Sequence, residues 1–387
     1  MIQNTITTCE ECKKGKEIAK SGDFPHIYQT LREQGLMEKC VACMQASYRS
    51  FFNEKNFELE EKMWETLTVL GLYDPPTMEH SIRTFSIAND LATKTLLGPR
   101  GENVVLKEYV KESGVTFREL LLSALCHDIG KIKIPLEILH NSLTDTDMNR
   151  ILIDIIRKKE HLDDLEEQLG RTLDELSKKS DEEIISIVYE KGIRPVIILP
   201  LTKVFPESKY PGILSTLKER GFSENQTIPS VTKIHEDEGL RIFTYLGEPL
   251  IADLVGHHHN YKKEGEAEMK YIMKIPLLKS RGYDAVFGIY NIIKIADSMD
   301  SLQSERPYKK GMSKISALAE LSHQVLTGRI EKSICYLWVN TEYREIKKTM
   351  QESGIVDHNF QDKQAVETIE KFLTEAEQEF DRRLTER

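Results

Sequence analysis

The sequence predicts a mainly α-helical protein, and three observations lead to that fold class. Apolar residues recur at the three- and four-residue spacing of amphipathic helices through most of the chain. Neither an internal repeat nor a low-complexity tract interrupts this pattern. With 387 residues, and at roughly 150 residues per domain, the chain has room for two or three domains and for a sizeable buried core.

The composition is that of a globular protein with an acidic balance. Hydrophobic residues make up 40% of the chain, charged residues 30%, and the formal net charge is −10. Binding to duplex nucleic acid normally needs a basic face, so we expect no such partner. A small anionic substrate remains compatible with this charge, because bound metal ions can supply a local positive potential.

Membrane insertion and secretion are both unexpected. No stretch approaches the roughly 18 consecutive apolar residues of a membrane-spanning helix, and the first residues lack the pattern of a signal peptide. Six cysteines in a chain of this length do not resemble the disulfide framework of a small secreted protein. We therefore expect a cytoplasmic protein without a membrane partner, whose cysteines are reduced or bind metal.

Residues 1–48 are predicted to form a small metal-binding module. They contain the pairs Cys9-x-x-Cys12 and Cys40-x-x-Cys43, and each pair can bind one metal ion through two thiolates. The 27 residues between the pairs exceed the roughly 15–20 of a zinc ribbon. A zinc site with four thiolate ligands is the leading interpretation. An iron–sulfur cluster, a thiol–disulfide pair and unreactive cysteines remain open.

Between the cysteine pairs, Phe24-Pro25 is expected to break the chain and residues 27–35 to form a short helix, with His26 as an alternative metal ligand. An amphipathic helix is predicted over residues 48–71. Gly71 and Pro75-Pro76 end it. Residues 49–76 would thus connect the cysteine module to the rest of the chain.

Two further helices lead to a His-Asp pair. The first starts near Thr77 and carries His80 in its first turns. The second, residues 117–127, is strongly apolar and runs into His127-Asp128-Ile129-Gly130-Lys131. Both helices would bury an apolar face and so fix the positions of these polar side chains.

Residues 144–191 are highly charged, with Ile, Leu and Val at helical spacing. We expect one or two long, solvated helices here, in the manner of an arm or a coiled coil. Residues 195–229 are rich in Pro and Gly, and helices return at 231–246, 249–258 and 285–300. Residues 313–387 are expected to be mostly helical.

Histidines and aspartates gather at the ends of these helices. His80, the adjacent pair His127-Asp128, His235, the triplet 257–259 and Asp297 all lie on or next to predicted helices. Imidazole and carboxylate together suit Mn, Fe, Zn, Co or Ni. Each helix of a bundle could direct its ligands inward, and a carboxylate that bridges two ions holds them about 3.5–4 Å apart.

Six segments, in this order, resemble the HD superfamily of metal-dependent phosphohydrolases, and specifically its HD-GYP branch. They cover residues 77–145 and 231–315. The segments are Glu79-His80-Ser81-Ile82-Arg83, the run from His127-Asp128-Ile129-Gly130-Lys131 to Leu139, Leu143-Thr144, His235-Glu236-Asp237-Glu238-Gly239, His258-His259, and Ala296-Asp297-Ser298-Met299-Asp300 with Arg306-Pro307-Tyr308.

This resemblance implies a set of site residues. Asp128 would bridge two divalent transition metals such as Fe or Mn, and Lys131 and Arg306 would contact the substrate phosphate, with Tyr308 near the same wall. His257 would be a partner of the ligands, unless the histidine triplet is aligned one residue earlier. The implied metal ligands are His80, His127, Asp128, His235, His258, His259 and Asp297.

The resemblance also implies an organisation of the chain. A catalytic HD domain would span residues 77–325, interrupted by an insertion over about 150–230, and a helical extension would occupy 326–387. The fold expected overall is an HD-domain helical bundle with an inserted helical arm and the small cysteine module. The arm could serve as a lid, as a surface for homodimerisation, or as a solvated decoration.

Two further departures from the branch concern the site itself. After the paired histidines the branch carries Asp-Gly-x-Gly-Tyr-Pro, whereas this chain has Asn260-Tyr261-Lys262-Lys263-Glu264, which puts recognition of cyclic di-GMP in doubt. Residue 76 is Pro where some members have an acidic ligand for a third metal. We therefore expect two metals.

The function expected is hydrolysis of a phosphodiester bond in a small nucleotide, with a cyclic dinucleotide as one candidate. A hydroxide held between the two metals would attack phosphorus in line, helped by Lys131 and Arg306. Two alternatives stay open. One is another HD-type enzyme, a phosphomonoesterase or an iron oxygenase, and the other is a catalytically weak signalling protein that senses a ligand in the same pocket.

Overall fold

The structure is a computed structural model that describes residues 9–112, 114–141, 143–160, 162, 165–259, 283–305, 310–328, 330, 332–353 and 362–385. Across these residues it is mainly helical, which confirms the predicted fold class. The described residues form two compact units. The first comprises those up to Gly130, from Glu236 to Glu305, and from Lys310 onward, and the second comprises Lys131–His235. None of the described helices is both long and apolar enough to cross a membrane.

Four helices open the first unit: α1 (Glu10–Ala19), α2 (Phe24–Glu33), α3 (Met37–Glu54) and α4 (Glu61–Tyr73). The short helix expected over residues 27–35 is present as α2, but it begins three residues earlier, so Phe24-Pro25 starts the helix and does not lie in the break before it. The Asp23 side chain accepts a hydrogen bond from the His26 backbone N–H, and Pro25 lies in the first turn, where a helix tolerates proline.

The single helix predicted over residues 48–71 is also wrong. The chain leaves α3 at Lys55 and enters α4 at Glu61, and Asn56 between them has φ 50°. This turn brings Phe57 back against the end of α3, where the Phe52 and Phe57 rings lie 6.4 Å apart. Phe85 packs against both rings, at 5.3 and 5.0 Å. The sequence shows no break in the apolar pattern at this turn, because α3 and α4 both bury apolar side chains against the same aromatic cluster.

The next elements carry the His-Asp pair and its neighbours. They are α5 (Pro75–Thr93), the antiparallel strands β1 (Leu96–Leu97) and β2 (Asn103–Val104), α6 (Leu106–Glu112) and α7 (Phe117–Cys126). A capping box between Thr116 and Glu119 fixes the start of α7. Leu120, Leu121 and Leu125 are fully buried, so α7 ends inside the unit rather than at its surface.

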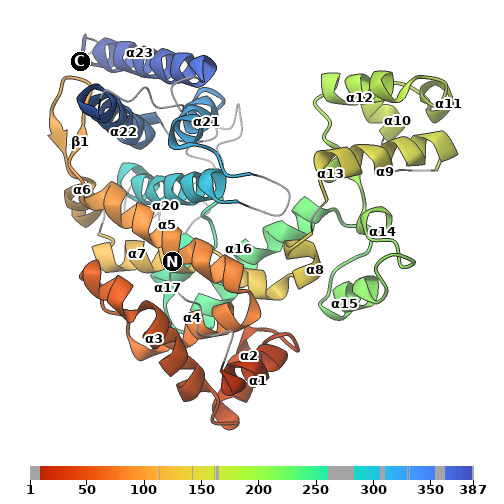
Figure 1. Ribbon diagram of the computed structural model, residues 1–387, viewed down its shortest axis with the longest axis horizontal. Helices are drawn as coiled ribbons and strands as arrows, with labels where there is room; N and C mark the ends of the chain where they lie inside the picture. The colour runs from red at the N-terminus through yellow and green to blue at the C-terminus, as the bar shows by residue number, and fades with distance from the viewer. Residues whose placement is uncertain are drawn as a thin grey trace. The chain divides into compact units, whose positions relative to one another are not determined.

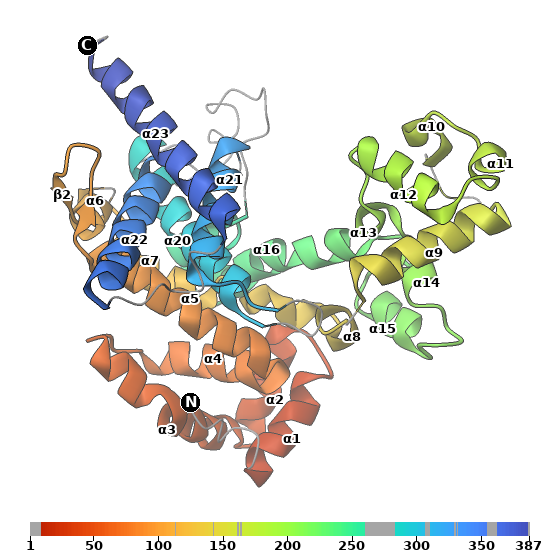
Figure 2. The ribbon, with the colours of Figure 1, turned by 45° about the horizontal axis from the view of Figure 1, so that its top comes forward.

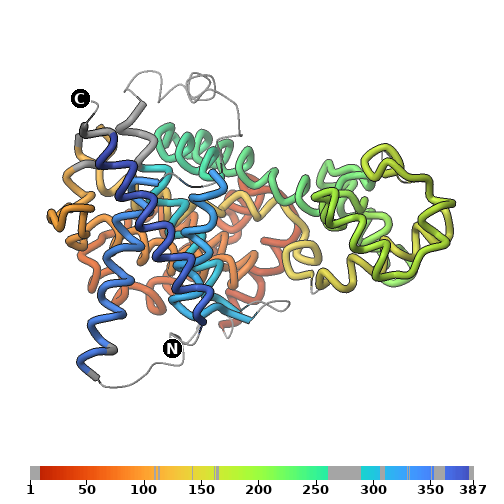
Figure 3. Tube along the Cα trace, turned by 90° about the horizontal axis from the view of Figure 1, so that it is seen from above, coloured from red at the N-terminus to blue at the C-terminus, as the bar shows by residue number. Residues whose placement is uncertain are grey.

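The rest of the first unit is α17 (Pro249–Val255), α20 (Tyr283–Gln303), α21 (Lys314–Leu326), α22 (Lys332–Ser353) and α23 (Lys363–Thr385), together with the later part of α16 (Ile228–Tyr245). Helix α5 packs along α20 and also contacts α7, which in turn contacts α17 (Figure 1). Helices α22 and α23 lie side by side (Figure 3). This packing brings together residues that are more than two hundred positions apart in the sequence.

The second unit folds differently from the expected long, solvated helices. Its elements are α8 (Leu136–Leu139), α9 (Asp145–Lys158), α10 (Leu165–Leu169), α11 (Leu173–Leu176), α12 (Asp181–Glu190), α13 (Pro195–Ile198), α14 (Leu201–Val204) and α15 (Ile213–Glu219), with a 3-10 turn, Ile129–Lys133, before them. Four of the short helices, α11, α12, α13 and α14, contact α9 (Figure 2).

Capping and burial explain why this charged segment forms short helices. Capping boxes begin α9 at Thr144, α11 at Thr172 and α12 at Ser180, and each uses an acidic residue three positions later. The apolar faces enclose a core of their own that includes Leu152, Leu176 and many other buried aliphatic side chains. Much of the charge therefore belongs to helix starts and to the outer faces of a packed unit.

Candidate metal centre

Two helices and the ends of two others bring the candidate ligands of the first unit together. His80 lies in the second turn of α5, and Asp297 lies on α20, which packs along α5. His127 is the residue that ends α7, and Asp128 follows it. His258 comes shortly after α17, which contacts α7. His80, His127, Asp128 and His258 are all buried.

The ligand atoms form two overlapping groups. In one, the side chains of His80, His127 and Asp297 offer three atoms within 4.8 Å of one another, and in the other His127, Asp128 and His258 do the same. His80 Nε2 lies 3.0 Å from Asp297 Oδ1 and 3.2 Å from His127 Nε2. Asp128 Oδ2 lies 3.4 Å from both of these nitrogens. His127 belongs to both groups.

The other ring nitrogen of each histidine is already engaged. His127 Nδ1 donates to the Ala124 carbonyl at 2.9 Å, and His258 Nδ1 donates to the Val255 carbonyl at 2.6 Å. His80 Nδ1 lies 2.6 Å from Asp300 Oδ2. When an imidazole is neutral, these bonds keep its proton on Nδ1 and leave the Nε2 lone pair for a metal ion, which is how metal-ligating histidines are usually held. The donor set therefore fits divalent transition metals.

Asp300 is a functional candidate that the sequence analysis assigned no role. It is buried, and besides His80 it accepts hydrogen bonds from Arg83 Nε at 2.7 Å and Arg83 Nη2 at 3.1 Å. The signal was present in the sequence, because Asp300 lies three residues after Asp297 and so shares its face of the helix. Arg83 belongs to the same chain of contacts.

The carboxylates of the centre favour positive charge on the neighbouring histidines. Burial by itself would lower the pKa of His127, but the carboxylates of Asp128 and Asp297 outweigh burial and raise it to about 10. Burial would raise the pKa of Asp297, yet its hydrogen bonds to His127 and His80 hold it well below the usual range. Protons thus supply the positive charge that a bound cation would otherwise provide.

Lys294 is a second residue that the sequence analysis missed. It lies on α20, one turn before Asp297, and is buried. Burial lowers its pKa to about 7, although the carboxylates of Asp297 and Glu236 act in the opposite direction. Glu236 also accepts a hydrogen bond from the backbone N–H of His259 at 3.0 Å. A buried amine therefore stands among the acidic groups near the candidate ligands.

The other residues predicted for the site lie beside the centre, in the second unit or outside the described residues. His259 lies beside His258, with ring centroids 4.1 Å apart. His257 Nδ1 donates to the Asp253 carbonyl at 2.8 Å. His235 and Lys131 belong to the second unit, so the geometry of the first unit does not test their roles. Arg306 and Tyr308, like the segment 260–266 in which the branch motif is missing, lie outside the described residues.

The cysteines of the N-terminal segment also converge. The Sγ atoms of Cys9, Cys12 and Cys43 lie within 4.8 Å of one another. Cys40 is buried and its thiol is a hydrogen-bond partner of Cys12. His26 is exposed on α2 and is not part of this group.

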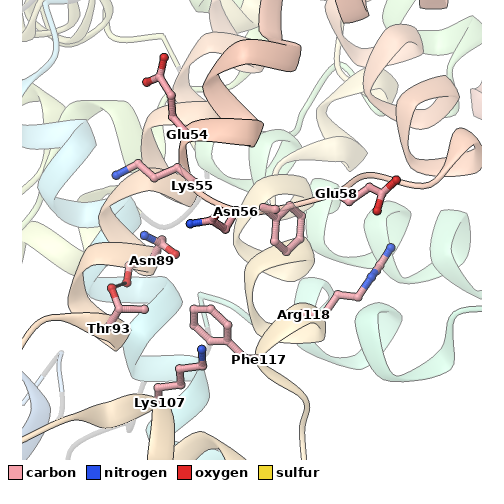
Figure 4. A pocket seen from close by; sticks show the side chains of 10 residues that line it. Glu54, Lys55, Asn56, Glu58, Asn89, Thr93, Lys107, Phe117 and Arg118 are labelled. Atoms are coloured by element: carbon pink, nitrogen blue, oxygen red, sulfur yellow. Dashed lines mark hydrogen bonds between the residues drawn. The ribbon is translucent and has the colours of Figure 1, made fainter.

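A separate cavity of about 590 Å³ lies among α3, α5, α6 and α7 (Figure 4). Lys55, Lys107 and Arg118 bring positive charge to its lining, Glu54 and Glu58 bring negative charge, and the Phe117 ring also faces it. None of the candidate metal ligands lines this cavity. It is therefore not the place where the His-Asp centre would receive a substrate.

A comparison with protein families identifies one match: residues 77–204 match the family model of the HD domain. The matched range contains His80, His127 and Asp128, whereas His258 and Asp297 lie beyond it. No curated protein and no solved structure matches this chain significantly. The match supports the HD superfamily and, in general terms, metal-dependent phosphohydrolase activity. The HD-GYP branch and the phosphodiesterase specificity stay predictions.

Proposed function

We propose that the His-Asp centre of the first unit is the active site of a metal-dependent phosphodiesterase that acts on a small nucleotide. One observation carries the proposal. The Asp128 carboxylate can bridge two ions, and its Oδ2 lies 3.4 Å from both His80 Nε2 and His127 Nε2. Two overlapping groups of ligand atoms lie around these side chains, and each could bind one of two neighbouring ions. An imidazole nitrogen binds one ion only, so His127 would be a ligand of one of the two.

His80, His127, Asp128, His258 and Asp297 would hold two divalent transition metals such as Fe or Mn, and His235 and His259 are proposed to complete the set. When bound, the metals would neutralise charge on the phosphoryl oxygens and lower the pKa of a water molecule. The protein's own part is orientation. Contacts to the Ala124 and Val255 carbonyls hold the rings of His127 and His258, and Asp300 with Arg83 holds His80.

Lys131 and Arg306 are proposed to bind the substrate phosphate, with Tyr308 beside them. Lys131 follows Asp128 by three residues in the sequence, and its ammonium group suits a point-charge contact with a phosphate oxygen. The guanidinium of Arg306 suits a bidentate contact. A cyclic dinucleotide is one candidate substrate, although the chain lacks the Gly-Tyr-Pro motif of the branch that acts on such compounds.

The direct test is hydrolysis of bis(p-nitrophenyl) phosphate by the full chain loaded with Mn²⁺ or Fe²⁺, followed by a panel of linear and cyclic dinucleotides. Asp128→Ala should lower kcat by about 1,000-fold or more, because it removes a ligand from the reacting centre. Asp237→Ala, at an exposed position of α16, is the matched control and should leave the rate unchanged. Undiminished hydrolysis by Asp128→Ala or by metal-stripped protein would refute this mechanism.

The same experiment addresses the alternative of a ligand sensor. The segment after His259 departs from the branch motif, which is the observation that favours a sensor. A sensor would bind a nucleotide measurably in titration calorimetry and would release no product even with both metals bound. Turnover with either metal decides for the enzyme.

A further inference from the structure

The two Cys-x-x-Cys pairs meet between two helices of the first unit. Cys9 immediately precedes α1, and Cys12 lies in its first turn. Cys40 and Cys43 lie one turn apart on α3. Residues three apart share one face of a helix, and α1 packs directly on α3. Both pairs therefore point to the same interface.

The sulfur atoms are close enough for one small ion. Those of Cys9, Cys12 and Cys43 all lie within 4.8 Å of one another, and the Cys40 thiol contacts that of Cys12. Gly15 makes room for this approach, because a Cβ atom there would lie 3.3 Å from Cys40 Sγ and 3.0 Å from Leu72 Cδ1. Packing of α1 on its neighbours thus brings three of the thiols together and places the fourth, that of Cys40, against Cys12.

Without a bound cation, the four thiols would contribute little to the stability of the folded protein. None of these cysteines is in a disulfide, and Cys12 and Cys40 are completely buried. Thiols are weak hydrogen-bond donors and acceptors, so four of them stabilise one another only slightly. A divalent cation would convert them into strong ligands.

We propose that Cys9, Cys12, Cys40 and Cys43 bind a single zinc ion in a closed, four-coordinate structural site. Zn–S bonds of about 2.3 Å place the sulfurs of a tetrahedral site about 3.8 Å apart, which agrees with three sulfurs inside 4.8 Å. An iron–sulfur cubane binds each thiolate through a different iron, so its cysteine sulfurs lie farther apart. The spacing therefore favours one ion over a cluster.

The zinc would act on stability and not on the reaction. Four protein ligands leave no open position for a substrate. Helix α1 has ten residues, too few to be stable alone, and the ion would fasten it to α3. Helix α1 also contacts α4, which is followed at once by α5 with His80. The site would thus support the helices on which the catalytic centre rests.

The test measures zinc per chain by elemental analysis in protein purified without added metal. One zinc ion per chain should be found in the wild type, in the catalytic variant Asp128→Ala and in the control Cys335→Ser, which lies on α22. The variants Cys12→Ser and Cys43→Ser should lose this ion. The Asp128→Ala variant tests the zinc site independently of the proposed phosphodiesterase activity, because it changes the His-Asp centre and leaves the cysteines intact. Cobalt loaded in place of zinc should give an intense visible band and thiolate charge-transfer absorption in the wild type.

Cys43 is partly exposed, so its variant should fold even if Cys12→Ser does not. Thiol titration of the wild type provides a second measure. Four cysteines should become reactive when a chelator is added, and the melting temperature should fall. Unchanged zinc in Cys43→Ser, iron with acid-labile sulfide, or a disulfide among the four cysteines by mass spectrometry would each overturn the proposal.

Discussion

At the scale of single residues, the candidate centre depends on how each imidazole is held. His80 is fixed by a buried carboxylate that is itself fixed by Arg83, whereas His127 and His258 are fixed by backbone carbonyls. Residue types in the sequence identified the imidazoles and Asp297 as candidates. They did not reveal the role of Asp300, because only the packing of α20 against α5 brings its carboxylate to His80.

Asp300→Asn should weaken metal binding by about 10- to 100-fold, because the amide holds the His80 ring less firmly and makes it less basic. Mn²⁺ titration calorimetry measures the loss, and kcat should fall at subsaturating metal and recover in part at high metal. Asp90→Asn, which breaks the more exposed ion pair with Lys55, is the control. Equal Mn²⁺ affinity in Asp300→Asn and wild type would show that Asp300 only stabilises the fold.

Metal affinity should rise with pH because the metal must displace the proton of His127. The carboxylates of Asp128 and Asp297 raise the pKa of this imidazole to about 10 in metal-free protein. Over about pH 6 to 8 the apparent affinity should therefore climb by up to about tenfold per pH unit for each proton released. Titration in buffers of different ionisation enthalpy counts those protons, and a flat profile would contradict the assignment.

The same raised pKa has the opposite effect on the stability of metal-free protein. A group whose pKa is higher in the folded state stabilises it fully below the unfolded value, about 6.5 for histidine. This contribution should disappear as the pH rises toward about 10. Chelator-treated protein should consequently lose stability over this range, whereas loaded protein should not show the same loss.

At the scale of elements, the sequence predicted that these segments are helical, but it did not predict where each helix begins and ends. Apolar spacing across residues 48–71 could not show that the chain turns at Asn56, since the helices on both sides bury one aromatic cluster. Phe24-Pro25 suggested a break but begins α2, because a proline fits the first turn once Asp23 caps it. Charge density over 144–191 suggested long solvated helices, although capping boxes divide the segment into short ones.

Leu152→Ala should destabilise the second unit by about 2–5 kcal/mol, because Leu152 is fully buried in a core that belongs to this unit. Hydrogen-exchange mass spectrometry should show lost protection in peptides from 131–235 and little change in α5, α7 and α20. Ile197→Ala, at a side chain that is 54% exposed, is the control. Equal loss of protection in both units would mean that they unfold as one.

At the scale of the whole molecule, the chain consists of two compact units with separate cores, and the first unit is built from three stretches of sequence. The residues that form the centre come from the first and second of these stretches. Contacts of α5 with α20 and α7, and of α7 with α17, bring them together. A second polar cluster, that of the cysteines, lies between α1 and α3 of the same unit.

By itself, the sequence determined the helical class, the candidate metal ligands and the two cysteine pairs, because periodicity and ligand chemistry are local properties. Tertiary structure alone decided that His127 belongs to two groups of ligand atoms, that the Asp300 carboxylate contacts His80, and that three cysteine sulfurs lie within 4.8 Å of one another. These are facts of packing: they depend on which helices touch and at what distance, and side-chain spacing along the chain does not encode that.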